Sequence, residues 1–155
     1  MVTTRFSAFV SAAILAAACG SSGPATNFSA TLSGASEVPA TTSTATGTAT
    51  FTLSGTTVNY TVTYAGLSGA PTASHMHVGA STVAGGVVVA FSGLPTTTSG
   101  TFSGSFTQAN ITAQTNPVIN TLDDLLAQMR AGNTYANIHT AAHTGGEIRG
   151  QIAGH

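Results

Sequence analysis

Alternating apolar and polar residues dominate the chain from Phe28 onward. The stretch "FSATLSG" (28–34) alternates Phe28, Ala30 and Leu32 with serine and threonine. The same period of two residues runs on both sides of "SGTT" in residues 47–67. This period is typical of half-buried β-strands. A glycine-bearing turn between two such runs predicts a β-hairpin.

Further strands are predicted in the second half of the chain. "GGVVVAFSG" (85–93) is an apolar run short enough for a buried strand, and "GTFSGSFTQ" (100–108) alternates again. "YANIHT" (135–140) and "GEIRGQIAG" (146–154) read as two more strands joined by a loop. Short strands at this spacing, separated by turn signals, predict an all-β antiparallel Greek-key sandwich or barrel.

One segment, near residues 121–131, has a helical period instead. Thr121 is a candidate N-cap, and Gly132 follows the last turn. We expect one short α-helix that covers an end of the β-core; a helix that docks a partner is the alternative. Its apolar positions at helical spacing are Leu122, Leu125, Leu126 and Met129.

Charge is scarce throughout the chain. Charged residues make up 5% of it, there is no lysine, and the formal net charge is −1, whereas roughly a quarter of an average globular protein is charged. A surface of threonine, serine, glycine and alanine has no positive field to hold phosphate backbones, so we expect no binding to nucleic acid. Such a surface favours an extracytoplasmic protein.

The first residues agree with that location. Arg5 is followed by an apolar run that ends at Ala18, directly before Cys19, the only cysteine. The run is too short to span a bilayer and has the form of a signal peptide over residues 1–18. "AAAC" favours a bacterial lipoprotein, with Cys19 lipidated and residues 19–26 as a tether to a domain over 27–155. Ordinary secretion into or beyond the cell envelope is the alternative.

Two histidine pairs are the candidate chemistry. His75 and His77 in "ASHMHVG" are two residues apart, so on a strand they share one face roughly 6.5 to 7 Å apart, while Met76 points into the core. His139 and His143 would be roughly 13 Å apart on a continuous strand. We therefore expect the strand to end near Thr140, and a loop to bring His143 back toward His139.

Four histidines with almost no competing charge predict a nitrogen-donor metal site. Imidazole suits copper, zinc, iron and nickel, whereas magnesium and calcium require oxygen ligands that this chain scarcely offers. Copper is the first choice because the affinity order of divalent metals peaks there. The alternative for each histidine is an ordinary polar residue on a β-sheet.

Three motifs in a fixed order resemble the chordin-type (CHRD) domain: "LSGASEVPATTSTATGTATFTL", "YAGLSGAPTASHMHVG" and "AGNTYANIHTAAHTGGEIRGQI". The resemblance covers about residues 27–153. It implies an extracellular domain, and it implies fold and location more than activity. The family pattern also suggests that Glu37 pairs with Arg149.

"GLSGAPTASHMHVG" is also similar to the stretch of copper-zinc superoxide dismutases in which a turn leads into a His-x-His pair of copper ligands. That resemblance implies a superoxide-dismutase-like sandwich, although an immunoglobulin-like one is equally compatible with the pattern. It also implies a catalytic role for Arg149 in attracting superoxide. No cysteine pair and no zinc subsite are present, so the resemblance implies a single metal. A structural ion pair of Arg149 with Glu147 is the alternative.

Two functions follow from these features. The first is superoxide dismutation at one metal bound by His75, His77, His139 and His143. The second is a non-enzymatic module of the cell surface that binds a partner, supports structure or stores a metal. The expected partners are a metal ion, a small anion such as superoxide and, through the lipid anchor alone, a membrane. A protein partner is unknown.

Overall fold

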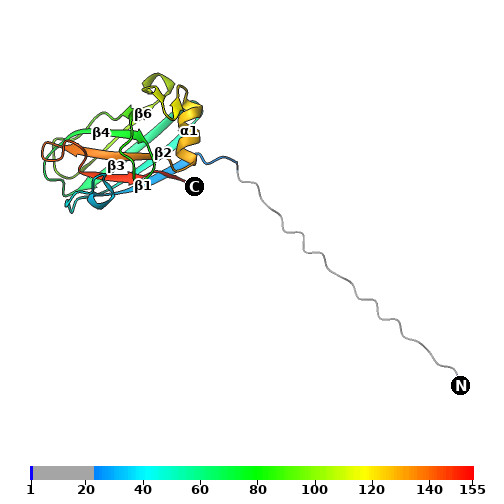
Figure 1. Cartoon of the computed structure of the whole chain (residues 1–155), viewed down its shortest axis with the longest axis horizontal. Helices are drawn as coiled ribbons and strands as arrows, with labels where there is room; N and C mark the ends of the chain where they lie inside the picture. The colour runs from blue at the N-terminus through cyan, green and yellow to red at the C-terminus, as the bar shows by residue number, and fades with distance from the viewer. Residues whose placement is uncertain (2–22) are drawn as a thin grey trace.

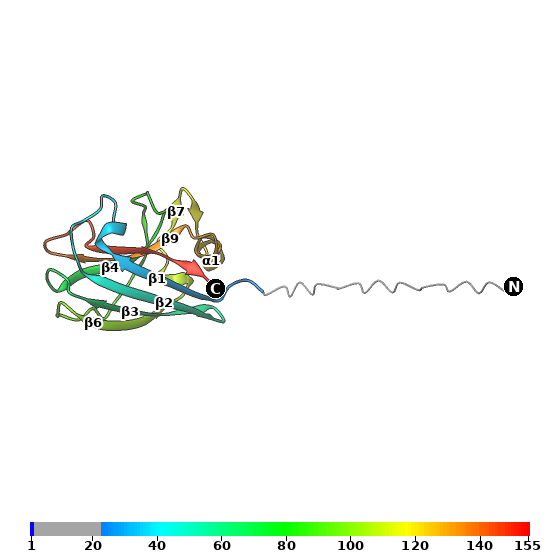
Figure 2. The same cartoon turned by 90° about the horizontal axis from the view of Figure 1, so that it is seen from below.

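The computed structural model describes Met1 and residues 23–155. These residues form a mostly antiparallel sheet that curls into a nearly closed barrel, with one short helix at its end (Figures 1 and 2). The predicted all-β antiparallel fold with a single α-helix is therefore confirmed. The predicted signal peptide (1–18) and the lipidation candidate Cys19 lie outside the described residues, Met1 excepted.

The main sheet has nine strands, in the order β5-β4-β9-β10-β1-β2-β3-β6, and β11 also pairs with β1. A separate hairpin pairs β7 with β8. The strands are β1 Asn27–Ser33, β2 Thr46–Ser54, β3 Thr57–Ala65, β4 Pro71–Val78, β5 Val87–Ala90, β6 Gly100–Phe106, β7 Gln114–Thr115, β8 Val118–Ile119, β9 Thr134–Thr140, β10 Ile148–Gln151 and β11 Ala153–Gly154. Two 3₁₀ turns, Gly34–Ser36 and Gln108–Asn110, and helix α1, Leu122–Arg130, complete the fold.

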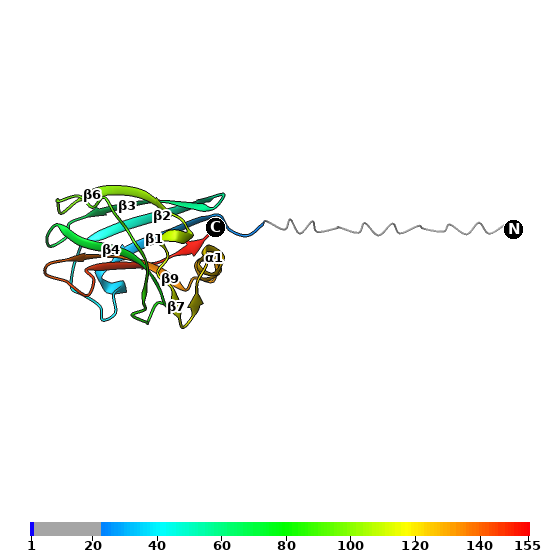
Figure 3. The same ribbon diagram turned by 90° about the horizontal axis from the view of Figure 1, so that it is seen from above.

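The chain crosses between the two sides of the barrel after β3. β4 and β5 lie opposite the β2–β3–β6 side, and β6 then returns beside β3 (Figure 3). The predicted hairpin is β2–β3: its register ends at Ser54 opposite Thr57. Gly55 has φ 59° in the turn between them. Glycine adopts this left-handed conformation without steric cost, and this favours the tight turn.

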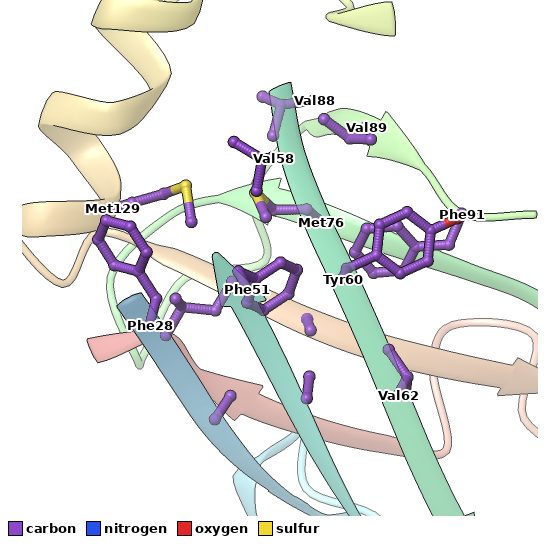
Figure 4. Close-up of a cluster of buried hydrophobic side chains, with 14 of the residues drawn as sticks. Phe28, Phe51, Val58, Tyr60, Val62, Met76, Val88, Val89, Phe91 and Met129 are labelled. Carbon is purple, nitrogen blue, oxygen red and sulfur yellow. The ribbon is translucent and has the colours of Figure 1, made fainter. Parts of the chain in front are cut away.

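The core fills the inside of the barrel. Aromatic and aliphatic side chains from both sides meet there (Figure 4), for example Phe28, Phe51 and Tyr60. Met76 of β4 is fully buried among them, as its position between two histidines predicts. Because successive residues of a strand face opposite sides, His75 and His77 lie on the outer face of β4. The fold thus separates the apolar core from the histidines.

Helix α1 closes one end of the core. It runs over Leu122–Arg130, within the predicted range, and all four of its predicted apolar residues are buried. Thr121 caps it: its hydroxyl accepts from the Asp124 N–H, and the Asp124 carboxylate accepts from the Thr121 N–H. This capping box satisfies N–H groups that have no partner inside the helix. Within residues 23–155, no helix combines the length and apolar character needed to cross a bilayer.

Candidate metal centre

Three histidines meet on the outer face of β4 and β9. His75 and His77 come from β4, and His139 comes from β9, where it pairs with Ala73 of β4. One ring nitrogen from each histidine lies within 4.8 Å of the other two. The cluster could hold a metal ion, because small ring rotations would bring the nitrogens to the separations of up to about 4.2 Å that ligands of one ion have.

The closest pair of nitrogens has the spacing of two ligands of one metal. His75 Nδ1 lies 3.2 Å from His139 Nε2. Two nitrogens each bound at 2.0–2.1 Å with a tetrahedral angle between them would be about 3.3 Å apart. The His77 ring centroid is 5.5 Å from that of His75, so the third ring lies beside the pair.

Backbone carbonyls orient two of the rings. Nδ1 of His139 lies 2.9 Å from the Thr144 carbonyl oxygen. Nδ1 of His77 lies 3.0 Å from the Gly85 carbonyl oxygen. A carbonyl only accepts, so each of these contacts favours the proton on Nδ1, which leaves Nε2 as the nitrogen with a lone pair for a metal. A hydrogen bond of this kind on the far nitrogen is the usual support of a metal-bound histidine.

Two neighbours of His77 complete its surroundings. Asn137 is 2% exposed, and its Oδ1 lies 3.2 Å from His77 Nε2. This oxygen only accepts, so it competes with the Gly85 carbonyl, 3.0 Å from Nδ1, for the single proton of the neutral ring. The Tyr135 ring stacks on the His77 ring with centroids 4.7 Å apart and an interplanar angle of 2°. Sequence reasoning missed both residues. The alternation of a strand could have found them: Asn137 and Tyr135 lie two and four residues before His139 in β9, so they share its face.

Two imidazoles of the cluster, His75 and His77, are held neutral. Burial, together with the neighbouring His139 and His77, lowers the pKa of His75 to about 4. Burial also lowers the pKa of His77, against the opposing effect of its hydrogen bond to Gly85. A metal binds neutral imidazole, so at neutral pH these two rings already have the charge that a metal requires. In the metal-free protein His75 Nδ1 donates to His139 Nε2, and a bound metal would replace that proton.

His143, predicted as a fourth ligand, does not join the three. The strand ends at Thr140 as expected, but Thr140 and His143 then exchange backbone hydrogen bonds of 3.1 and 3.4 Å in a tight turn. The turn brings the Thr144 carbonyl back to His139 in place of the His143 ring. His143 instead lines a separate surface pocket with Glu37 and Gly146.

Arg149 lies one strand further, on β10. Its guanidinium carbon is 3.3 Å from the centroid of the Tyr135 ring, and the side chain is 1% exposed. It donates to the carbonyl oxygens of Ala80 at 2.8 Å and Val83 at 2.9 Å. Since β9 lies between β4 and β10, the Tyr135 ring separates this guanidinium from His77.

Glu147 has partners other than the predicted Arg149. Its carboxylate accepts hydrogen bonds from Ser43, from Thr140, and from both the hydroxyl and the backbone N–H of Ser68. Burial acts to raise the pKa of Glu147, but these hydrogen bonds outweigh it and hold the pKa below its usual value. The predicted pairing fails because Glu147 precedes the first residue of β10 and turns toward these hydroxyls.

Glu37 is buried near Arg149. Its Oε1 atom has no hydrogen-bond partner. Burial raises the pKa of Glu37 to about 7, and the Arg149 charge acts in the opposite direction. The two charges therefore influence one another, but the hydrogen bonds that orient the guanidinium go to Ala80 and Val83.

The fold and the cluster define the class of protein: an antiparallel β-barrel domain with three histidines on its outer face that could hold a metal ion. The model of the CHRD domain family matches residues 28–152. The chain belongs to this family, as its three motifs predict. The comparison with curated proteins gave no match, and neither did the comparison with solved structures.

Proposed function

We propose that this protein binds one transition metal ion through Nδ1 of His75, Nε2 of His77 and Nε2 of His139. The convergence of three ring nitrogens from two strands supports this proposal. Among residues 23–155, carboxylates and thiolates take no part in the cluster, so the described donor set is uniform. Three protein ligands also leave coordination positions to water or a small molecule.

Copper is the metal that we propose first. Imidazole nitrogen suits copper, zinc, iron and nickel, and affinity is highest for copper in the series of divalent ions. The supports of the site fit this choice, since the carbonyls of Gly85 and Thr144 fix two rings before a metal arrives. Zinc, iron and nickel are the alternatives that metal analysis distinguishes.

We propose superoxide dismutation as the activity of the copper-loaded protein. A bound copper ion would supply one-electron exchange. His75 and His139 are partly exposed, so a small anion has access to the cluster from solvent. Arg149 was predicted to attract that anion. Its guanidinium would have to act through its electric field, past the Tyr135 ring, because it is 1% exposed.

A non-enzymatic metal-holding module of the cell surface is the second candidate. The shielded position of Arg149 favours it, since a guanidinium that is 1% exposed behind the Tyr135 ring cannot contact an anionic substrate at the cluster. In this case the metal would be stored, delivered or used to tie β4 to β9. Both candidates need the same three histidine ligands, and only the first converts superoxide.

The test begins with the metal content of the purified protein, followed by a superoxide assay of the copper-loaded form. One metal per chain, with activity that disappears on chelation and returns with copper, would support the enzyme. Full copper loading without activity would leave the metal-holding module. Protein that takes up none of the four metals in stoichiometric amount would overturn both.

We also propose export and a lipid anchor at Cys19. The form of residues 1–18 and the "AAAC" sequence support this. Wild-type protein expressed in a bacterium should appear in the membrane fraction, and Cys19→Ser protein should be released from it. Membrane association that survives the Cys19→Ser substitution would contradict the anchor.

A further inference from the structure

The loop between β4 and β5, residues 79–86, covers part of the outer face next to the cluster. It follows His77 by two residues, and the β4–β5 register shifts between Met76 and His77. Gly85 is the residue of this loop that contacts the site. A Cβ atom at Gly85 would overlap the Val78 carbonyl. The loop therefore needs glycine there for its backbone to approach β4.

Gly85 is bonded to two residues of the outer face. Its carbonyl oxygen lies 3.0 Å from His77 Nδ1, and its N–H donates to the Tyr135 hydroxyl oxygen at 3.0 Å. The Gly85 carbonyl competes with Asn137 Oδ1, which lies 3.2 Å from Nε2, for the one proton of the neutral ring. The shorter contact favours the proton on Nδ1 and leaves Nε2 for a metal. The position of Gly85 thus decides which His77 nitrogen is available.

The other end of the loop is held from β10. Arg149 donates to Ala80 and Val83 through its two terminal nitrogens. Gln151 donates to the Gly79 carbonyl at 2.8 Å. A planar guanidinium with several fixed donors can hold two carbonyls at once, which a single ammonium group on a flexible stem does not reproduce.

We infer that Arg149 is a positioning residue for His77: it clamps the 79–86 loop so that the Gly85 carbonyl fixes the proton of His77 on Nδ1 and leaves Nε2 free for the metal. The path runs from the guanidinium through the carbonyls of Ala80 and Val83 to Gly85. The Tyr135 ring, between Arg149 and His77, supports the same arrangement through stacking and through its hydroxyl.

This inference rests on the proposed metal site, but its first test does not. In the metal-free protein, long-range ¹H–¹⁵N spectra report which nitrogen of each histidine is protonated. We expect His77 to carry its proton on Nδ1 in the wild type and to become a mixture of both tautomers in Arg149→Gln. An unchanged Nδ1–H tautomer in Arg149→Gln would overturn the inference, whether or not the protein binds metal.

The second readout is copper binding. Loss of a residue that orients a ligand typically weakens metal affinity 10- to 100-fold, so we expect a loss of about that size in Arg149→Gln, with a changed Cu(II) EPR spectrum. Wild-type affinity and an unchanged spectrum in this variant would contradict the clamp. If wild-type protein itself binds no copper, the proposed function fails, and the tautomer result alone decides the inference.

Arg149→Lys separates clamping from anion attraction. Lysine keeps the positive charge but cannot hold two carbonyls as a fork, so the clamp predicts altered tautomer and affinity in this variant too. Retention of the wild-type tautomer, affinity and spectrum in Arg149→Lys would contradict the clamp and favour a role through charge.

Two controls match these variants. Arg130→Gln removes the other arginine of the described residues, which is exposed on α1 and donates to Ala25. Leu125→Ala destabilises the fold from a buried position on α1. Both should keep the wild-type His77 tautomer and EPR spectrum. A change in Leu125→Ala equal to that in Arg149→Gln would show a general effect of stability and overturn the specific role.

Tyr135→Phe decides the question if Arg149→Gln and Arg149→Lys do not fold. It removes the hydroxyl that accepts from Gly85 but keeps the ring between His77 and Arg149. We expect a smaller shift in the same direction, with some His77 protonated on Nε2 and copper affinity reduced a few-fold. A Tyr135→Phe protein identical to the wild type in both readouts would contradict the loop as the device that positions His77.

Discussion

Successive residues of β4 and β9 point to two faces that differ in chemistry: an apolar inner face and a polar outer face. On the inner face, Met76 and Ile138 are 0% exposed and pack in the apolar core. On the outer face, His77 is 7% exposed and Asn137 2%. The inner layer is held by non-directional burial. The outer layer is held by hydrogen bonds and ring stacking, which require specific atoms at specific positions.

This difference assigns different roles to the two faces. An inner side chain contributes the area that it removes from water, so its loss should lower stability without moving the histidines. An outer side chain contributes a lone pair, a proton or a ring face, so its loss should change the site more than the stability. If this is so, inner substitutions should lower stability and leave metal binding intact, and outer substitutions should do the reverse.

The largest effect is expected for the double variant His75→Ala, His77→Ala. It removes two of the three clustered nitrogens. Metal affinity, measured by competition with a chelator, should fall by more than about 100-fold, since even loss of an outer supporting residue costs 10- to 100-fold. His143→Ala is the matched control and should bind like the wild type. A double variant that keeps its metal would place the site elsewhere.

Met76→Ala tests the inner face between the same two histidines. Truncating a buried methionine typically costs 2–5 kcal/mol, because apolar contacts are lost and a cavity remains. We expect a loss of about that size in the unfolding free energy measured in urea, with copper affinity unchanged within a few-fold. Loss of copper binding by the folded Met76→Ala protein would show that the two faces are not separable.

Glu37 makes the outer side of the barrel sensitive to pH. Its folded pKa of about 7 lies above the ordinary value of 4.5, so between these values the folded state keeps a proton that the unfolded state releases. The stability that neutral Glu37 contributes is complete below pH 4.5 and declines as pH rises through about 7, by up to about 3 kcal/mol. Urea unfolding of wild type and Glu37→Gln at pH 4.5 and 8 measures the difference. An equal change with pH in both proteins would contradict the assignment.

The smallest effect is expected at the helix that closes the inner core. Thr121→Ala removes the hydroxyl that caps α1, and such a change typically costs about 1 kcal/mol. The thermal midpoint should fall slightly, while the metal affinity and the His77 tautomer stay as in the wild type. Thr121→Ser, which keeps the hydroxyl, should restore most of the loss.

Much of the fold was predictable because its signals are local. The alternation around Gly55 predicted the β2–β3 hairpin, and the spacing of Leu122 and Leu125 predicted α1. The pair His75 and His77 was predictable for the same reason, since residues two apart on a strand share a face whatever lies around them. His139 was predicted as a ligand together with His143, but its partner strand could not be derived from its own neighbours.

The sequence by itself determined the strands, the hairpin, the helix and the two faces of β4, because covalent geometry and the burial of apolar side chains act over a few residues. Only the tertiary structure decided which groups meet outside the barrel. The register of β4 with β9 brings His139 to His75, the turn at Thr140 returns a carbonyl in place of His143, and the pairing of β9 with β10 sets Arg149 behind Tyr135. The first and third of these contacts join residues far apart in the chain, so strand register determines them. The turn is local, but the backbone path of its loop, and not the spacing of His139 and His143, decides which group returns to the site.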